Sequence, residues 1–205
     1  SLVDEIIFPE ICPECNSKLE KLESEANFFC INYIDCRPQA IGRIQHFVSR
    51  KAMNIDSLGS ETIELLIKKK IVFDVADLYS LKVEDLIPLK KDGVKWAENI
   101  IMGIEDSKKV PFERVLFALG IRHVGETVSK KLTQYFSSID KLMSLTIEDL
   151  INVDEIGHKI AESIVNYFSV NSNLINRLKQ HNLNFISEKQ ESNLSNKLNG
   201  ERIVV

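Results

Sequence analysis

The apolar residues of this chain follow a short pattern that occurs four times. Each copy has an apolar residue, two variable residues, a second apolar residue and a glycine, and apolar residues at helical spacing follow. The second copy is imperfect, because Asp92 occupies its second apolar position. The glycines lie 34, 32 and 32 residues apart, a period typical of repeated supersecondary units. The pattern predicts four units of helix, tight turn and helix, with Gly59, Gly93, Gly125 and Gly157 in the turns.

A longer internal similarity groups these units in pairs. Residues 78–87 read LYSLKVEDLI, and residues 142–151 nearly restate them as LMSLTIEDLI. Because the similarity spans two units, we expect a mainly α fold in which four helical hairpins form two pairs. In the second copy, the spacing of Thr146 and Asp149 predicts a variant of the capping box at a helix start.

Helix starts repeated in this way favour contact with phosphate. Glycine permits a tight bend, including one with positive φ, and lets another backbone come close because it has no Cβ. The following helix begins with N–H groups that lack intrahelical partners, at the positive end of the helix dipole. A single turn of this kind usually serves only to reverse the chain. Four at nearly constant spacing favour a nucleic-acid backbone, whose contacts position a protein without reading sequence.

Length and composition allow one helical core and a smaller module. The chain has 205 residues, of which 44% are hydrophobic. The sequence has no apolar run of membrane length and no signal-peptide pattern at its start, so we expect a soluble cytoplasmic protein without a membrane partner. Because the sequence opens at Ser1 rather than Met and stops in the apolar run 203–205, we expect it to be a fragment.

The net charge of −4 argues against a nucleic-acid binder, whose affinity normally rests on Lys and Arg. Its distribution changes that picture, because residues 1–39 carry three Lys and Arg against eight Asp and Glu, whereas residues 40–185 carry twenty against nineteen. We expect the positive charge of the helical part to lie on one face, although such runs are often only solvated surface. The lysines concerned are 68–70, Lys90, Lys91, Lys95, Lys130, Lys131 and Lys159.

All four cysteines lie near the amino terminus, in the spacing C-x2-C-x14-C-x5-C. Two such pairs can supply four thiolates to one tetrahedral zinc ion. Two disulfides are the alternative, but they need an oxidising compartment. Four protein ligands leave no open position for water or substrate, so we expect the zinc to be structural. The predicted ligands are Cys12, Cys15, Cys30 and Cys36.

The rest of this module offers few residues for a core. Alternating character over residues 27–34 predicts a short hairpin that carries the third ligand. We expect the module to need the metal to hold its shape. The only residues available to bury are Phe28, Phe29, Ile31, Tyr33 and Ile34.

Three motifs together give the chain a resemblance to bacterial NAD-dependent DNA ligases. After the last cysteines the chain reads CRPQ at 36–39, GRI at 42–44 and HFVSRKAM at 46–53, and later it reads ALGIRHVG at 118–125. The cysteine spacing and the four hairpins fit the same family. The resemblance covers about residues 9–185. It implies a linker from an upstream OB-type domain at 1–10, a zinc finger at 11–40 and four helix-hairpin-helix motifs at 41–185. A linker at 186–197 and the first strand of a BRCT domain at 198–205 would follow.

The resemblance also implies a function. Enzymes of this family seal nicks in duplex DNA during replication and repair, after loading AMP from NAD onto a lysine of an adenylation domain. That domain, the catalytic residues and the sites for NAD and Mg²⁺ would lie outside this sequence. The present segment would grip nicked duplex DNA across the minor groove, without sequence preference, as part of a monomeric enzyme of the bacterial cytoplasm and nucleoid. The isolated segment is expected to be inactive as a ligase.

Lys90 and Trp96 each have a simpler explanation than a functional one. Residues 90–93, KKDG, match the K-x-D-G pattern in which DNA ligases place the lysine that carries AMP. However, Gly93 keeps the register of the hairpin repeat and no glycine-rich nucleotide pocket surrounds it, so we predict an ordinary turn with solvated lysines. Because Asp92 breaks the pattern, this turn is expected to be the least regular of the four. Trp96 shares a helical stripe with Ile100 and is predicted to belong to the core.

The predicted DNA contacts lie at the turns and in the first turns of the helices that follow. His123 and His158 lie at turns, and no catalytic constellation accompanies them. Two other functions stay open: a helix-hairpin-helix repair enzyme, and a zinc-stapled helical module that binds proteins. The predicted contacts are Gly59, Ser60, Gly93, Lys95, Gly125, Lys130, Lys131, Gly157, His158 and Lys159.

Overall fold

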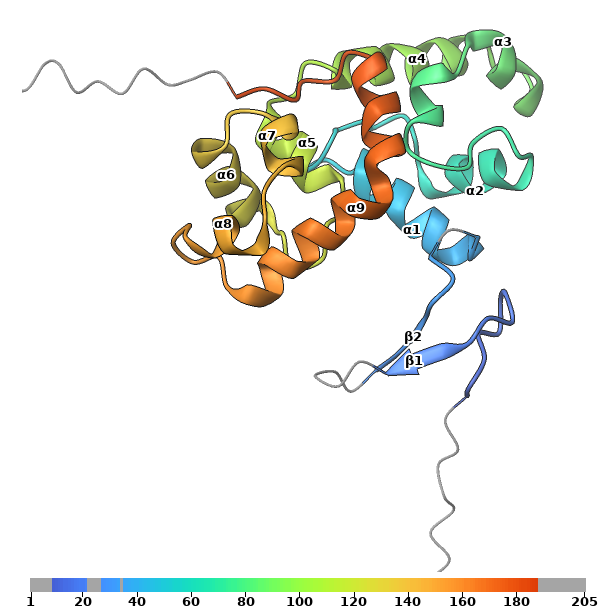
Figure 1. The fold of residues 1–205 in the computed structure, drawn as a ribbon. Helices are drawn as coiled ribbons and strands as arrows, with labels where there is room; N and C mark the ends of the chain where they lie inside the picture. Colours follow the sequence, from blue (N-terminus) through green and yellow to red (C-terminus); the bar gives the residue numbers. More distant parts are fainter. Residues whose placement is uncertain (1–8, 22–26, 34, 188–205) are drawn as a thin grey trace, which may run out of the picture.

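The structure is a computed structural model that describes residues 9–21, 27–33 and 35–187, and it is mainly helical, as predicted (Figure 1). The elements in chain order are β1 (Leu19–Lys21), β2 (Phe28–Cys30), α1 (Arg37–Val48), α2 (Ser60–Lys68), η1 (Asp77–Ser80), α3 (Val83–Leu86), η2 (Ile87–Leu89), α4 (Val94–Ser107), α5 (Phe112–Ala118), α6 (Glu126–Tyr135), α7 (Ile139–Met143), α8 (Ile147–Ile151) and α9 (His158–Gln180).

The four repeated patterns become four helical hairpins. Helix α1 packs on α2, α3 on α4, α5 on α6 and α8 on α9. Each pattern glycine is the residue directly before the second helix of its hairpin. The apolar positions bury as the period predicts: in the first hairpin Phe47, Ile63 and Leu66 are almost completely buried. The helical period in the sequence therefore located both the hairpins and their core faces.

The internal similarity is visible in the hydrogen bonds of the two copies. The Asp85 carboxylate accepts from the backbone N–H of Lys82 at 2.9 Å, and the Asp149 carboxylate accepts from that of Thr146 at 2.9 Å. The Thr146 hydroxyl also accepts from the Asp149 N–H, which confirms the predicted capping box. We call the first and second hairpins, residues 37–107, the first pair, and the third and fourth, residues 112–180, the second pair.

One continuous apolar core joins the two pairs, with α1 packed on α5. Helix α9 is the longest element among the described residues and has non-helical dihedral angles at Asn171. Figure 1 shows α9 rising from the region of α8 toward α4, so that it spans the second pair and reaches the first. No helix in the described part of the chain combines the length and the apolar character needed to cross a membrane.

The cysteine module lies beside this body and contains the predicted hairpin, since β1 pairs antiparallel with β2 and Cys30 ends β2 (Figure 1). The few apolar residues that the sequence offers for a core are not enclosed where the structure describes them. Phe28, Phe29, Ile31 and Tyr33 are 38%, 38%, 53% and 43% exposed, and Ile34 lies outside the described residues. A module of this size has too little chain to enclose four large side chains.

At the other end, the first two residues of the expected linker are attached to the helical body. Ile186 forms an antiparallel bridge with Ser138, and the Ser187 N–H donates to the Ser137 carbonyl at 2.8 Å. The rest of that linker, the expected strand at 198–205 and most of the expected linker at 1–10 lie outside the described residues.

Candidate nucleic-acid interface and metal centre

The four cysteine sulfur atoms converge on one point, all within 4.8 Å of one another. The Sγ atoms of Cys12 and Cys36 are 3.9 Å apart, and those of Cys15 and Cys30 are 3.4 Å apart. Tetrahedral zinc with bonds of about 2.3 Å places its sulfur ligands about 3.8 Å from each other. The donor set and its spacing therefore fit the predicted structural zinc ion.

The ligands come from three different local structures. Cys12 and Cys15 belong to a turn that is followed by Asn16, which has a φ of 58°, and the Cys12 N–H donates to the Ser17 carbonyl at 2.7 Å. Cys30 ends β2, and Cys36 is the residue directly before α1. A bound metal would thus fasten the hairpin to the start of the first helix of the body.

The thiols differ in how readily they ionise. Hydrogen bonds from Ser17 lower the pKa of Cys15 to about 6. Desolvation raises the pKa of Cys30 to about 12, and it also raises that of Cys36. Cys15 therefore ionises more readily than Cys30 and Cys36, from which a bound cation must displace protons at neutral pH.

Side chains of the helical body hold the module in place. The Gln39 side-chain amide donates to the Cys30 carbonyl at 3.1 Å. The Arg43 guanidinium lies 4.3 Å from the ring centroid of Tyr33 and donates to the Tyr33 carbonyl at 2.6 Å. The Arg122 guanidinium lies 5.2 Å from the ring centroid of Phe29. Because Arg122 belongs to the third turn, the module contacts both α1 and a candidate DNA-binding turn.

Three of the four pattern glycines share one geometry. Gly59, Gly125 and Gly157 have φ angles of −72°, −83° and −82° with extended ψ, which any residue can adopt. A Cβ on any of them would meet no atom of the described part of the chain within 4 Å. These glycines do not use the positive φ that glycine permits; in the third and fourth turns the positive φ lies two residues earlier, at His123 and Glu155.

The fold itself therefore gives no reason for glycine at these three positions. The residue directly before each of the three helices is a glycine, and no side chain at this position caps the helix. Ser, Asp or Asn at this position would cap the helix at least as well as glycine does. A missing Cβ and uncapped N–H groups leave room for a ligand outside the protein. We call these three the open turns.

The second turn is different. Gly93 is buried with φ −80° and ψ 1°, and a Cβ there would lie 2.7 Å from the Lys90 carbonyl oxygen. Asp92 takes the left-handed conformation with a φ of 56°. Glycine is required here by packing within the protein. Trp96 is half-buried against the core, as predicted, and the Lys90 ammonium lies 5.5 Å from its ring centroid.

Polar contacts connect the three open turns into one strip. Arg50 lines the hollow beside Gly59 and also the cleft that contains Glu126 and Lys130. The Lys51 ammonium lies 2.8 Å from the Glu126 carboxylate, directly after Gly125. We call this strip the three-turn surface, and its members are Arg50, Lys51, Gly59, Gly125, Glu126, Lys130, Lys131, Glu155 and Gly157.

Lys131 links the third and fourth turns within that surface. Its ammonium lies 2.5 Å from Glu155 Oε2 and 3.2 Å from the Asp154 carbonyl oxygen, both in the turn before α9. The fourth turn is itself hollowed, with a cavity of about 610 Å³ lined by residues 151–157. The three-turn surface therefore includes turns from both hairpin pairs.

The other predicted contacts occupy varied positions. Ser60, Lys95, Lys130 and Lys159 are exposed. His158 is exposed at the start of α9, with its Nδ1 atom 3.3 Å from a Glu162 carboxylate oxygen. The second turn, with Gly93 and Lys95, is not part of the three-turn surface.

Two residues beside the third turn were not among the predicted site residues, Lys51 and Arg114. The Arg114 guanidinium donates to the Arg50 carbonyl at 2.6 Å and to the Lys51 carbonyl at 3.2 Å. It thereby holds the loop after α1 against α5, and both residues line a cleft of about 590 Å³ with Glu126 and Lys130. The adjacent basic residues at 50 and 51 could have signalled this site, whereas no local signal marks Arg114.

Two family descriptions match parts of the chain. Residues 12–37 match the NAD-dependent DNA ligase C4 zinc finger domain, and residues 114–175 match the helix-hairpin-helix motif. The first match contains the four cysteines, and the second contains the two open turns of the second pair.

Curated proteins named DNA ligase match almost the whole chain. The chain is 50% identical to the DNA ligase of Flavobacterium psychrophilum over 197 residues, which cover 95% of this chain and 30% of that protein. It is 50% identical to the DNA ligase of Phocaeicola vulgatus over 205 residues, covering 98% and 31%. It is 51% identical to that of Cytophaga hutchinsonii over 177 residues, covering 85% and 26%. The chain thus spans about three tenths of the length of these relatives.

Proposed function

We infer that this chain belongs to the NAD-dependent DNA ligases, and we propose that it is the segment with which such an enzyme holds nicked duplex DNA. The sequence similarity and the two family matches support the ligase assignment. The observation that carries the DNA-holding role is the group of three open turns, where glycine is present although the fold does not need it.

Each open turn can hold one phosphate group. The first N–H groups of α2, α6 and α9 have no intrahelical partners, and the dipole of each helix favours an anion at that end. The absent Cβ lets the sugar–phosphate backbone come within hydrogen-bond reach. Contacts of this kind carry no sequence information, which suits an enzyme that must act at nicks in any sequence.

The turns are not equally favourable for an anion. The first turn of α9 has no acidic residue and begins with His158 and Lys159, whereas α2 and α6 carry Glu61 and Glu126 in their first turns. Lys51 offsets the charge of Glu126 through their ion pair. We therefore expect the fourth turn to contribute most to phosphate binding, and Lys51 to make the third turn usable.

The zinc module and the missing parts of the enzyme have separate roles in this proposal. A zinc ion held by the four cysteines would supply only structural cross-links. Transfer of AMP from NAD and sealing of the nick with Mg²⁺ would take place on adenylation and OB-type domains elsewhere in a monomeric enzyme. The chain described here would keep the duplex in place while those domains act.

Salt-dependent binding of nicked and intact duplex DNA to the purified chain tests the proposal. Three phosphate contacts predict that log K falls with log salt with a slope of about −3, or more steeply if lysines add contacts. Affinities should differ little between unrelated sequences. Failure to bind either duplex at low salt would contradict the DNA-holding role and favour a helical module that binds proteins.

A further inference from the structure

Helix α9 belongs to the second pair and also contacts the first pair. Its first part packs on α8 within the second pair. At Asn171 the helix changes direction, with φ −109° and ψ 16°, and the Asn171 side-chain amide donates to the Tyr167 carbonyl at 2.9 Å. Beyond this kink, α9 extends to the first pair. One continuous helix therefore connects the two halves of the body.

The polar contacts of α9 with the first pair include a fork made by Arg177, and His181, the residue directly after α9, lies 3.3 Å from Ser80 Oγ and 5.9 Å from the ring centroid of Tyr79. One guanidinium nitrogen lies 2.6 Å from an Asp74 carboxylate oxygen, and another lies 2.5 Å from an Asp77 carboxylate oxygen. Both carboxylates are fixed by backbone N–H groups of their own loop: Asp77 accepts from Phe73 and Asp74, and Asp74 accepts from Ala76 and Asp77. The guanidinium therefore binds a rigid pair of acceptors rather than two mobile side chains.

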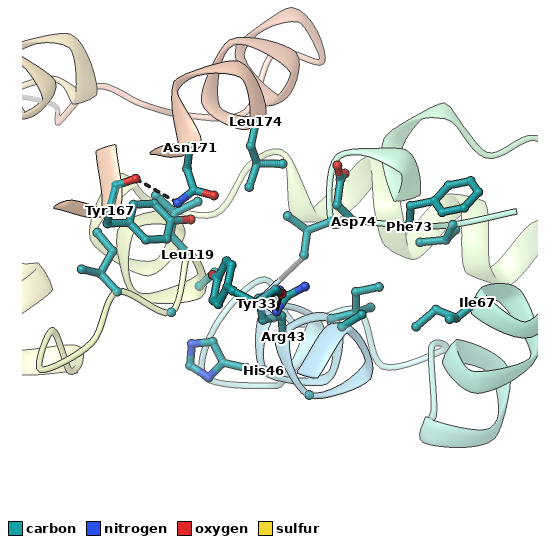
Figure 2. A pocket seen from close by; sticks show the side chains of 18 of the residues that line it. Tyr33, Arg43, His46, Ile67, Phe73, Asp74, Leu119, Tyr167, Asn171 and Leu174 are labelled. Carbon is teal, nitrogen blue, oxygen red and sulfur yellow. Dashed lines mark hydrogen bonds between the residues drawn. The ribbon is translucent and has the colours of Figure 1, made fainter. Parts of the chain in front are cut away.

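A large groove beneath the kink makes this fork important. The groove has a volume of about 710 Å³ and is lined mainly by α1, the end of α5, residues 67–75 and α9. Figure 2 shows Asn171 and Leu174 of α9 on one wall, Phe73 and Asp74 on another, and Tyr33 and Arg43 between them. Because open space separates α9 from part of the 67–75 segment here, side-chain packing holds the two less firmly at the groove than in the continuous core.

The two pairs are also joined on the side of the three-turn surface. There α1 packs on α5, and Arg114 donates to the carbonyls of Arg50 and Lys51. A connection at one place allows the pairs to rotate about it, whereas a second connection on the other side of the groove fixes the angle. The fork supplies the charged part of that second connection, beside the contacts of His181 with Tyr79 and Ser80.

We propose that Arg177 is a positioning residue for duplex binding, because its fork to Asp74 and Asp77 sets the angle at which the first pair, with Gly59, faces the second pair, with Gly125 and Gly157. This inference rests on the proposed DNA-holding function. When both pairs are correctly placed, binding of one pair raises the effective concentration of the duplex at the other. Loss of the fork removes this gain and leaves each pair able to bind by itself.

The test measures affinity for duplexes of increasing length, from about 8 to about 30 base pairs, since one helical turn of DNA is about 10 base pairs. As the duplex is lengthened, its affinity for the unmodified chain should rise sharply once, at the length that first reaches both pairs. We call this rise the step. Arg177→Met should lose this step, with affinity for the longest duplex reduced about 10-fold or more and affinity for the shortest duplex unchanged. Small-angle X-ray scattering of the free variant should show a broader distribution of interatomic distances.

Two further variants separate the fork from the general stability of α9. Lys179→Met is the matched control, because Lys179 lies in the same last turn and pairs with Asp140 of α7, within the second pair. It should keep the step. Asp74→Asn removes the charge but keeps an oxygen for the N–H groups of Ala76 and Asp77, and it should lose the step as Arg177→Met does.

The outcomes are distinguishable. If the unmodified chain binds no duplex of any length, the proposed function fails. If that chain shows the step and Arg177→Met keeps it with an unchanged scattering curve, the role of Arg177 is overturned while the proposed function stands. Equal loss in Arg177→Met and Lys179→Met would also overturn that role, because it would trace the effect to the end of α9 rather than to the fork.

Discussion

Lys131 and Glu155 tie the third hairpin to the fourth turn through an ion pair of 2.5 Å. Lys131 also contacts the Asp154 carbonyl oxygen, and its side chain is only 22% exposed. Its neighbour Lys130 is exposed and lines the cleft beside Glu126. The sequence pattern predicted the same role, a DNA contact, for both lysines. Their surroundings in the structure differ, and we therefore expect different roles for them.

Replacing each lysine separately tests this difference. Lys130→Met should weaken duplex binding and reduce the magnitude of the salt slope by about 0.9, the value for one lost phosphate contact. Lys131→Met should leave the slope nearly unchanged and instead weaken binding by releasing the fourth turn. Fluorescence anisotropy titrations over a range of salt concentrations give both quantities. Equal slope changes in the two variants would assign Lys131 to phosphate as well.

A buried hydroxyl in α6 provides a test of the packing. Ser129 is completely buried, and its Oγ atom has no hydrogen-bond partner among the residues that the structure describes. Ser129→Ala should leave the free energy of unfolding unchanged or raise it by about 1 kcal/mol, because it removes an uncompensated polar group. Ser107→Ala is the control: its hydroxyl bonds to Tyr79 and to the Ile104 carbonyl at 2.9 and 2.7 Å, and its loss should cost about 1 to 2 kcal/mol. Urea unfolding of both variants measures the difference.

Removing the metal should affect the two modules differently. A chelator should release one zinc ion per chain and abolish the structure of the cysteine module, while the far-ultraviolet circular dichroism of the helices stays nearly constant. Duplex affinity should fall moderately, since Arg122 of the third turn packs on Phe29 of the module. A large loss of helical signal on chelation would show that the helical core needs the metal.

Zinc affinity should also depend on pH. Because the pKa values of Cys30 and Cys36 are raised, a bound metal must displace protons from them. Binding therefore weakens as the pH falls, and more steeply below about 6, where Cys15 also becomes protonated. Zinc titrations with a competing chromophoric chelator at several pH values measure this, and affinity that does not change with pH would contradict it.

Gly93 provides a test of the distinction between packing and ligand contact. A Cβ at this position would lie 2.7 Å from the Lys90 carbonyl oxygen, so Gly93→Ala should lower the free energy of unfolding by about 1 to 3 kcal/mol. The three open turns are unaffected, so duplex affinity measured well below the unfolding temperature should change little. Thermal unfolding and a binding titration on the same sample check both expectations.

The hairpins and the metal ligands could be predicted from the sequence because each depends on local spacing. The helical period marks the buried face of each hairpin, and four thiolates at suitable spacing converge through short loops. The restated segment at 142–151 likewise predicted the capping box at Thr146 correctly, since its partners are three residues apart. Signals of this kind need no knowledge of the tertiary structure.

Contacts between distant segments could not be predicted in the same way. Arg114 bonds to carbonyl groups 63 and 64 residues away, and Arg177 pairs with Asp74 and Asp77 at separations of 103 and 100 residues. Neither arginine belongs to one of the short motifs on which the sequence predictions rested. The sequence also does not show that Gly93 serves packing while the other three glycines face open space, because this depends on which backbone atoms lie next to each Cα atom.

The double replacement Gly125→Ser/Gly157→Ser tests the central claim most directly. Serine fits the extended dihedral angles and the open space at both positions and can cap α6 and α9, so the free energy of unfolding should be unchanged or slightly higher. Its Cβ and hydroxyl would occupy the approach to the N–H groups, so duplex affinity should fall about 10-fold or more, equivalent to about 1.4 kcal/mol. Unchanged stability with unchanged affinity would contradict the assignment of the open turns to the DNA backbone.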